Sequence, residues 1–286
     1  MATVAVYGSV NWDEICQLPR YPGPHEKIDA LAIHSALGGS GANTATWLAA
    51  GVERVELIGA VGDDPEGSLC LEWLRAARIG HGCVEVLRRE RTSRACSWVV
   101  GSDKRIVTHR QAGLRRDHAP QTALASAAAA RHLHLGSLVD GAGLECLEAG
   151  TEAGATISIE LSGHAHDTAR EHADLVFLNV EELGSVFGIA VDELGTDTVA
   201  RVAPKRGATV VVTNGAIAVL CATRDGVRSL PVEPLEQVVD RTGGGDAFDA
   251  GFIAGWLAHG GELGAAVAEG LKCSRQVLRQ IGGSRR

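Results

Sequence analysis

The chain of 286 residues is long enough for one large domain or two small ones, and its content of 45% hydrophobic and 22% charged residues is typical of a soluble globular protein. A net charge of -8 without a basic stripe argues against a nucleic-acid-binding protein, and no apolar run approaches the roughly 20 residues that span a membrane. The seven cysteines are scattered, and the first residues predict a strand rather than a signal peptide, so we expect a cytoplasmic protein with reduced thiols.

The chain opens with a short β-rich run, Thr3 to Tyr7, that ends at Gly8. An apolar strand that meets glycine at its carboxyl end is how an α/β sheet delivers residues to a ligand crevice. The dinucleotide motif G-x-G-x-x-G is missing here. Asn11 and Asp13 follow, and their amide and carboxylate suit sugar hydroxyls, although such residues more often serve turns.

A glycine-rich run, Gly38-Gly39-Ser40-Gly41, opens a predicted helix of small and apolar residues that contains Asn43 and reaches Ala50. A glycine-rich loop before a helix can bind an anion, but this pattern alone is weak. The preceding residues 14–37 are rich in proline and predict an extended excursion with short strands.

The next strand, predicted at 55–61, is followed by Gly62-Asp63-Asp64-Pro65, where the proline indicates a helix start. The lysine of a P-loop is missing from this turn, which argues against a Walker-type kinase. Residues 84–111 then contain β-rich runs on both sides of Gly101-Ser102-Asp103, a hairpin signal. We interpret 14–37 and 84–111 together as a small β lid over the crevice of the sheet.

Strand and helix patterns alternate after residue 111, without a linker or low-complexity tract. Alternation of this kind predicts a mostly parallel sheet covered on both faces by helices. The predicted strands are 132–135, 156–160, 175–178 and 209–213, and the predicted helices lie around 120–130, 140–153, 166–172 and 192–203.

Two histidine pairs, His132-x-His134 and His164-x-His166, could ligate a metal ion. A third ligand at a recognisable spacing is missing, so structural roles are favoured.

Asn179 and Glu182 follow the strand predicted at 175–178. An amide and a carboxylate at the carboxyl end of a strand could organise a hydrated Mg²⁺, which borrows few protein ligands. The alternative is an ordinary helix start with Asn179 as its cap. The strand predicted at 209–213 likewise ends in a polar turn, Thr213-Asn214-Gly215.

Three consecutive glycines, Gly243 to Gly245, separate Asp240 and Thr242 from Asp246 and a helix that is apolar nearly all round. Backbone N–H groups without obstructing Cβ atoms, together with the helix dipole, make a site for phosphate. A carboxylate beside such a site repels the anion. This repulsion is tolerable if the carboxylate takes a proton from a hydroxyl that attacks the phosphoryl group. The alternative is a first-turn acid that the dipole stabilises.

The run from Asp240 to Phe252 closely resembles the signature D-T-x-G-A-G-D-A-F-x-A-G-F of the ribokinase-like, or PfkB, carbohydrate kinases, from which it departs at Arg241 and Gly244. The N-x-D pair, the G-G-x-x-x-N run from Gly38, the N-x-x-E element and the V-T-x-G turn are similar to other motifs of that family, in the same order. The resemblance implies one ribokinase-like α/β domain over 1–286, with a mostly parallel central sheet, helices on both faces and a small β lid.

The resemblance also implies an ATP-dependent kinase that transfers the γ-phosphoryl group to a hydroxymethyl group of a small sugar. Asp246 would be the general base, and Gly243, Gly244 and Gly245 the anion hole. The residues implied to bind the acceptor are Asn11, Asp13, Gly38, Gly39 and Asn43. Those implied to serve ATP and Mg²⁺ are Asn179, Glu182, Thr213 and Gly215, with Glu182 acting on the metal indirectly. Thr242 and the backbone near Asp240 lie where relatives hold a monovalent cation such as K⁺.

The acceptor stays open among sugars, sugar phosphates and nucleosides. Ser40 stands where ribokinases usually carry lysine, which argues against ribose, while Trp12 and Trp98 keep a nucleoside kinase as an alternative. A non-catalytic sugar-binding regulator is a further alternative, which the intact Gly-Gly-Gly-Asp run disfavours. In relatives the lid often forms a dimer contact, so a homodimer through the lid is expected.

Overall fold

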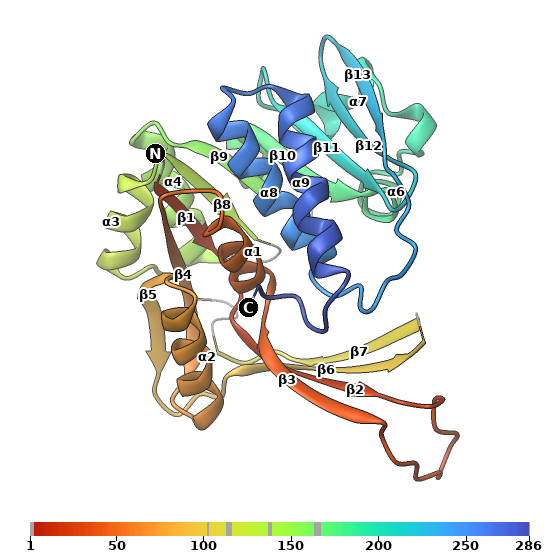
Figure 1. Cartoon of the computed structure of the whole chain (residues 1–286). Coiled ribbons are helices and arrows are strands. Elements are labelled where there is room, and N and C mark those ends of the chain that lie inside the picture. The colour runs from red at the N-terminus through yellow and green to blue at the C-terminus, as the bar shows by residue number, and fades with distance from the viewer. Residues whose placement is uncertain (1–2, 102, 113–115, 137–138, 163–166, 286) are drawn as a thin grey trace.

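A long twisted sheet runs through the middle of the molecule (Figure 1). The structure is a computed structural model that describes residues 3–101, 103–112, 116–136, 139–162 and 167–285. Within these residues the sheet has nine strands, in the order β13-β12-β11-β10-β9-β8-β1-β4-β5. Their bounds are β1 Thr3–Tyr7, β4 Arg54–Gly62, β5 Gly80–Leu87, β8 His132–Leu135, β9 Thr156–Glu160, β10 Leu175–Asn179, β11 Thr209–Asn214, β12 Ala218–Thr223 and β13 Gly226–Pro231.

The strands from β5 across to β11 are parallel. At one edge, β12 pairs antiparallel with β11, and β13 pairs antiparallel with β12. A mostly parallel sheet is therefore confirmed. Parallel strands need crossover connections, and helices supply most of them here. The carboxyl ends of the parallel strands meet at one edge of the sheet, where ligands bind in folds of this kind.

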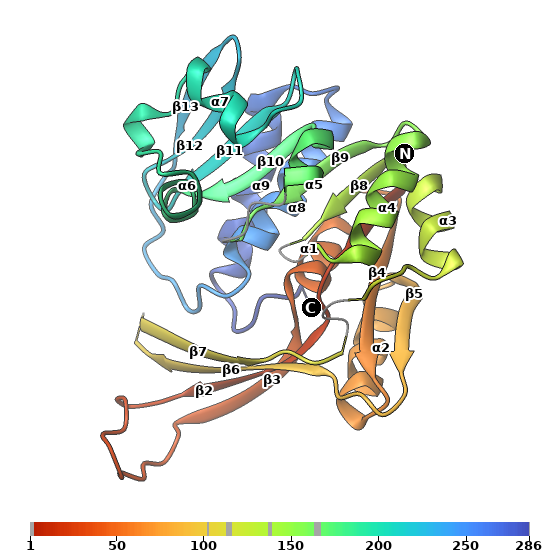
Figure 2. The same ribbon diagram turned by 180° about the vertical axis from the view of Figure 1, so that it is seen from behind.

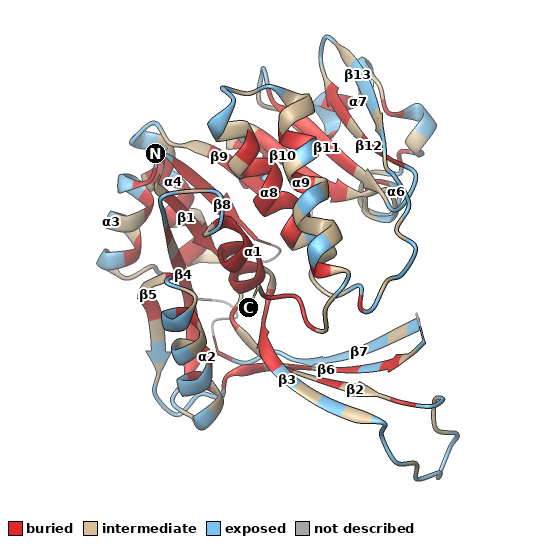
Figure 3. Cartoon of the chain, in the orientation of Figure 1, coloured by how far each residue is buried: buried red, intermediate tan, exposed pale blue. Residues whose placement is uncertain are grey.

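Helices cover both faces of the sheet, as the alternating pattern predicts (Figures 1 and 2). One face carries α1 Ser40–Leu48, α2 Pro65–Ala76, α8 Gly244–Ala258 and α9 Leu263–Val277. The other carries α3 Gln121–Ala129, α4 Gly141–Glu152, α5 Asp167–His172, α6 Val180–Phe187 and α7 Thr196–Val202, with a 3₁₀ turn at Val191–Glu193 before α7. Each face has its own apolar core, and Figure 3 shows the buried residues concentrated in the strands and in α1 and α8.

A second sheet projects from the main body (Figure 1). Its strand order among the described residues is β3-β2-β6-β7, with bounds β2 Asn11–Gln17, β3 Ala32–Gly38, β6 Ser93–Val100 and β7 Asp103–His109. Residues 84–87, which the sequence places in the lid, belong to β5 of the large sheet, because α2 returns the chain parallel to β4. The segment 93–109 and the flanks of 14–37 form the second sheet.

His132 and His134 lie fully buried on β8. Both rings hydrogen-bond the hydroxyl of Ser158 at 2.8 Å, and His132 also contacts Thr156 Oγ1 at 2.7 Å. These partners belong to the neighbouring strand β9, so the pair links two strands. Burial lowers the pKa of each ring to about 3, which keeps both neutral. His164 and His166 lie outside the described residues.

Candidate active site

The run of three glycines forms the start of α8. Gly243 is the N-cap and adopts a left-handed conformation with φ of 72°, and no side chain of the described residues caps this helix. Other helices do receive a side-chain cap, from Asp64 in α2, Asp140 in α4, Asn179 in α6 and Glu262 in α9. The first N–H groups of α8 therefore have no side-chain acceptor and, with the positive end of the dipole, form an anion site.

The three glycines differ in what surrounds them. A Cβ on Gly243 would lie 2.5 Å from the backbone of Gly283, so the fold itself requires glycine there. A Cβ on Gly244 would meet Leu278 at 3.5 Å, an ordinary contact. A Cβ on Gly245 would meet no atom of the described residues within 4 Å. The open space beside Gly245 is where a ligand can approach the backbone of the loop.

Asp246 lies in the first turn of α8 and accepts a 2.7 Å hydrogen bond from the amide of Asn43 on α1. The amide oxygen of Asn43 in turn accepts a hydrogen bond from Ser284 Oγ at 2.9 Å, which orients its NH₂ group toward Asp246. Burial raises the pKa of Asp246 to about 6, while the Asn43 hydrogen bond and the charge of Lys104 oppose that rise. A carboxylate with such a pKa is suited to accept a proton near neutral pH.

Asp13, on β2, is a buried carboxylate whose Oδ1 has no hydrogen-bond partner in the part of the chain that the structure describes. Burial raises its pKa to about 7, with the Lys104 charge opposing and the Asp246 charge adding. Gly38, on the neighbouring strand, makes room for it, because a Cβ there would lie 2.1 Å from Asp13 Oδ2. An unpartnered buried oxygen is costly, so Asp13 is prepared for a polar ligand.

Asn11 and Gly39 stand at the junction of the second sheet with α1. Asn11 begins β2 and pairs with Gly38, the last residue of β3. Gly39 is the N-cap of α1 with φ of 91°, and a Cβ there would lie 2.5 Å from the carbonyl oxygen of Ser9. The two segments that carry Asn11, Asp13 and Asn43 are therefore held close together.

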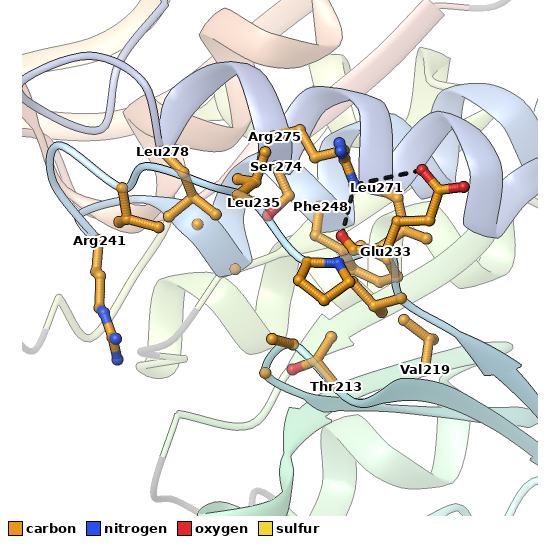
Figure 4. Close-up of a pocket in the computed structure, with 17 residues that line it drawn as sticks. Thr213, Val219, Glu233, Leu235, Arg241, Phe248, Leu271, Ser274, Arg275 and Leu278 are labelled. Atoms are coloured by element: carbon orange, nitrogen blue, oxygen red, sulfur yellow. Dashed lines mark hydrogen bonds and ion pairs between the residues drawn. The ribbon is translucent and has the colours of Figure 1, made fainter.

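An apolar pocket of about 430 Å³ opens beside the α8 loop (Figure 4). Thr213 and Val219 lie on one side of it, and α9 supplies Leu271 and Ser274 on the other. The lining residues are Thr213, Gly215, Ala216, Val219, Val232, Glu233, Pro234, Leu235, Val238, Arg241, Gly244, Gly245, Phe248, Leu271, Ser274, Arg275 and Leu278. An apolar slot that ends at the N–H groups of Gly244 and Gly245 fits a flat ring that carries phosphate groups.

Arg275 links two parts of the pocket wall. Its guanidinium donates a 2.6 Å hydrogen bond to the carbonyl oxygen of Glu233, and it lies 4.0 Å from the Glu233 carboxylate (Figure 4). Gly215, at the β11–β12 turn, has φ of 51°, a conformation that favours glycine. Both features hold walls of the pocket in place.

Asn179 and Glu182 form a capping box at the start of α6. The Asn179 side chain accepts from the Glu182 N–H, and the Glu182 carboxylate accepts from the Asn179 N–H, both at 2.9 Å. The helix-cap role is thus present in the structure. Burial raises the pKa of Glu182.

Two further carboxylates, Glu160 and Asp249, interact electrostatically with Asp246 and Glu182. Glu160 ends β9, and its buried Oε2 has no hydrogen-bond partner. Burial raises its pKa to about 8, and the charges of Asp246 and Glu182 add to the rise. Asp249 is buried on α8. Its burial, together with the charges of Asp246 and Glu182, raises its pKa strongly.

These four carboxylates together fit a divalent cation, whose charge would relieve their mutual repulsion. Among the described residues, no group of three acidic, histidine or cysteine side chains is arranged to hold a bare metal ion. A Mg²⁺ ion keeps several of its waters and so borrows few direct protein ligands. Neither Glu160 nor Asp249 is among the site residues that the sequence motifs predict. Both carry a local signal nonetheless, because Glu160 ends a strand as Asn179 does and Asp249 lies one helical turn after Asp246.

The Asp240–Thr242 turn is already bonded through its side chains. Asp240 Oδ1 accepts from the Thr242 N–H at 2.9 Å and from its hydroxyl at 2.6 Å, and Oδ2 accepts from the Gly282 N–H at 3.0 Å. The ammonium group of Lys104 also hydrogen-bonds Thr242 Oγ1. These side-chain oxygens do not fit the monovalent cation that the sequence suggests.

Comparison with known proteins shows the family of the chain. The model of the pfkB family carbohydrate kinases matches residues 1–285. An ATP-dependent ribose-1-phosphate kinase of Halopiger xanaduensis is 29% identical over 91% of this chain and 86% of its own length. An acarbose 7(IV)-phosphotransferase of Actinoplanes is 32% identical over 89% of this chain and 85% of its own. The structure of Arabidopsis thaliana ribokinase with ribose and ATP superposes with a TM-score of 0.85 at 21% identity, covering 98% of this chain and 94% of that one.

Proposed function

The chain belongs to the pfkB family of carbohydrate kinases, and we propose that it transfers the γ-phosphoryl group of ATP to a hydroxymethyl group of a small sugar. The observation that carries the proposal is the pairing of Asp246 with the uncapped start of α8. A base and an anion site within one helical turn place an attacking hydroxyl against a phosphoryl group.

Asp246 is the proposed general base. Its pKa of about 6 leaves it ionised at neutral pH and still basic enough to accept the proton of the hydroxyl. Asn43, held by Ser284, fixes the orientation of the carboxylate. The N–H groups of the Gly243–Gly245 loop would bind the charge that develops on the phosphoryl oxygens.

ATP would lie with its base in the apolar pocket and its phosphates against Gly244 and Gly245. Thr213 and Gly215 would form the wall beside the base. Asn179 and Glu182, together with Glu160, would hold a hydrated Mg²⁺. When bound, Mg²⁺ neutralises phosphate charge during transfer.

The acceptor would lie between the second sheet and α1, where Asn11, Asp13 and Asn43 meet. Its hydroxyls would supply the partner that Asp13 Oδ1 lacks. Gly38 and Gly39 keep this space clear of side chains. Closure of the second sheet over the acceptor would exclude water from the transfer.

The two tryptophans that favour a nucleoside lie away from this space. Trp12 neighbours Asp13 along β2 and so points to the opposite face, where its ring packs at 6.4 Å from that of Trp73. Trp98 pairs in register with Cys16, which also lies on the face opposite to Asp13. Neither ring lies on the Asp13 face to stack on a base, and this supports a sugar over a nucleoside.

The outward face of the second sheet exposes Ile33, Trp98 and Val107. Apolar side chains on an exposed sheet face favour contact with another protein surface. We propose that this face pairs with that of a second copy in a homodimer. Sedimentation of the native chain and of Val107→Lys tests this, and a native monomer at assay concentrations contradicts it.

ATP consumption with separate panels of sugars, sugar phosphates and nucleosides tests the function. We expect turnover with a sugar that carries a free hydroxymethyl group, and turnover lower by roughly 100-fold or more for Asp246→Asn under the same conditions. Preferred turnover of a nucleoside would replace the sugar assignment. A folded protein that binds sugars but consumes no ATP with any panel would identify a binding protein instead.

A further inference from the structure

Lys104 reaches from the second sheet into the catalytic centre. It pairs in register with Val99, which pairs with Gln17 on β2, so its side chain lies on the same face as that of Asp13. The side chain is 14% exposed. Its ammonium group hydrogen-bonds Thr242 Oγ1 and lies 3.9 Å from Asp240 Oδ1.

Three carboxylates act electrostatically on this ammonium group: Asp240, Asp13 and Asp246. Their charges support the protonated form of Lys104 against its burial. In return, the charge of Lys104 opposes the rise in pKa of Asp13 and Asp246. The lysine is thus a fixed positive charge shared by the acceptor carboxylate, the base and the turn that precedes the anion loop.

The side chains of this turn already have polar partners. The side-chain oxygens of Asp240 accept three hydrogen bonds, two from Thr242 and one from Gly282. The Thr242 hydroxyl donates to Asp240 and accepts from Lys104. Lys104 therefore already supplies a positive charge to this turn, and an added monovalent ion would have to compete with it for the same carboxylates.

We propose that the ammonium group of Lys104 is the built-in monovalent cation of the phosphate loop, so that this kinase works without added K⁺ or NH₄⁺. The proposal rests on the kinase function proposed above. It also ties the loop to the second sheet, because β7 carries the charge and its tip lies against residues 238–241. The ammonium group of Lys104 would lie beside the phosphate loop only when the second sheet lies over the site.

The first experiment compares kinase activity in Na⁺, K⁺ and NH₄⁺ buffers of equal ionic strength. The native enzyme should show equal kcat in all three. Lys104→Ala should lose roughly 10- to 100-fold in kcat, because a fixed charge near the transferred group is removed. K⁺, NH₄⁺ or ethylammonium should restore much of that loss. Arg105→Ala is the matched control, since Arg105 is exposed and its guanidinium lies over the Tyr21 ring, 3.9 Å from the centroid.

The second experiment measures thermal melting and needs no acceptor. An ion that binds only the folded protein raises its melting temperature. Replacing Na⁺ with K⁺ should leave the native melting temperature unchanged and should raise that of Lys104→Ala. Arg105→Ala should behave as the native protein does.

Activation of the native enzyme by K⁺ would overturn the proposal, and so would a K⁺-dependent rise in the native melting temperature. A Lys104→Ala enzyme with native kcat in Na⁺ would also overturn it. So would a loss that no monovalent cation restores, which would make the lysine a ligand of the substrate. Failure to find any acceptor would contradict the proposed function, whereas the melting comparison would still decide the role of Lys104.

Discussion

The side-chain amide of Asn43 on α1 donates a 2.7 Å hydrogen bond to the carboxylate of Asp246 on α8. The two residues are separated by 203 positions in the chain, and the packing of α1 on α8 brings them together. A neutral donor orients the carboxylate without neutralising it, unlike an arginine or lysine in direct contact. Asp246 is therefore held in place and still free to accept a proton.

Asp246→Asn tests the base. The amide is nearly isosteric and can still accept the Asn43 hydrogen bond through its oxygen, but it cannot take a proton. We expect kcat to fall by roughly 100-fold or more, with little change in ligand affinity. Steady-state kinetics and calorimetric binding of ATP measure the two effects. Near-native turnover in a purified, folded variant would show that another group is the base.

The three loop glycines provide a graded series. Gly244→Ala should be mild, because its Cβ makes only an ordinary contact with Leu278. Gly245→Val should fold normally, since its Cβ enters open space, yet it should block the approach of a phosphate and abolish turnover. Equal activity losses in these two variants would indicate that the loop serves folding only.

Gly243→Ala should act on stability instead. It combines φ of 72° with a Cβ only 2.5 Å from the backbone of Gly283. Strain and overlap together should lower the free energy of unfolding by about 1–3 kcal/mol. Chemical denaturation of this variant beside Gly244→Ala measures the difference, and equal stabilities would contradict the close packing of Gly243 on Gly283.

Local pattern was sufficient for much of the large sheet. The strands predicted at 132–135 and 156–160 match β8 and β9, and the strand predicted at 209–213 extends one residue further as β11. Short apolar runs bounded by turns carry this information locally. The helix predicted at 192–203 is instead a 3₁₀ turn and a shorter α7, because Gly195 interrupts it.

Other features depend on contacts that one sequence does not display. β5 resembles lid sequence in composition, and only its parallel pairing with β4 places it in the large sheet. β12 and β13 were not predicted at all. Lys104 reaches Thr242 through the register of three strands, and a shift of one residue would turn it to the other face.

The pH dependence of kcat/KM should reflect the raised pKa of Asp246. A general base must be ionised, so activity should be constant above the pKa of about 6 and should fall about tenfold per pH unit below it. Asp13, Glu160 and Asp249 in the same region also have raised pKa values, and their titration should broaden the limb toward higher pH. Lys104→Ala should move the limb to higher pH, because it removes a charge that favours the ionised base. An acid limb near the ordinary carboxyl pKa of 3.8 would contradict the assignment.

Asp13→Ala tests the acceptor site. Removing a buried carboxylate that binds hydroxyl groups should raise the KM for the acceptor by roughly 10- to 100-fold. The KM for ATP should change little, since the apolar pocket is lined by other segments of the chain. Turnover should also fall, because a poorly held hydroxyl is misplaced for attack.

Gly38→Ala supplies a matched variant that leaves the carboxylate in the chain. Its Cβ would lie 2.1 Å from Asp13 Oδ2 and would displace that group, so its effect on the acceptor KM should follow that of Asp13→Ala. Removing one ring hydroxyl from the substrate should weaken its binding to the native enzyme. The same removal should weaken binding to either variant less, because the contact between Asp13 and that hydroxyl is already lost. If both variants weaken ATP and spare the acceptor, Asp13 serves the nucleotide, and the two halves of the site are assigned in the wrong order.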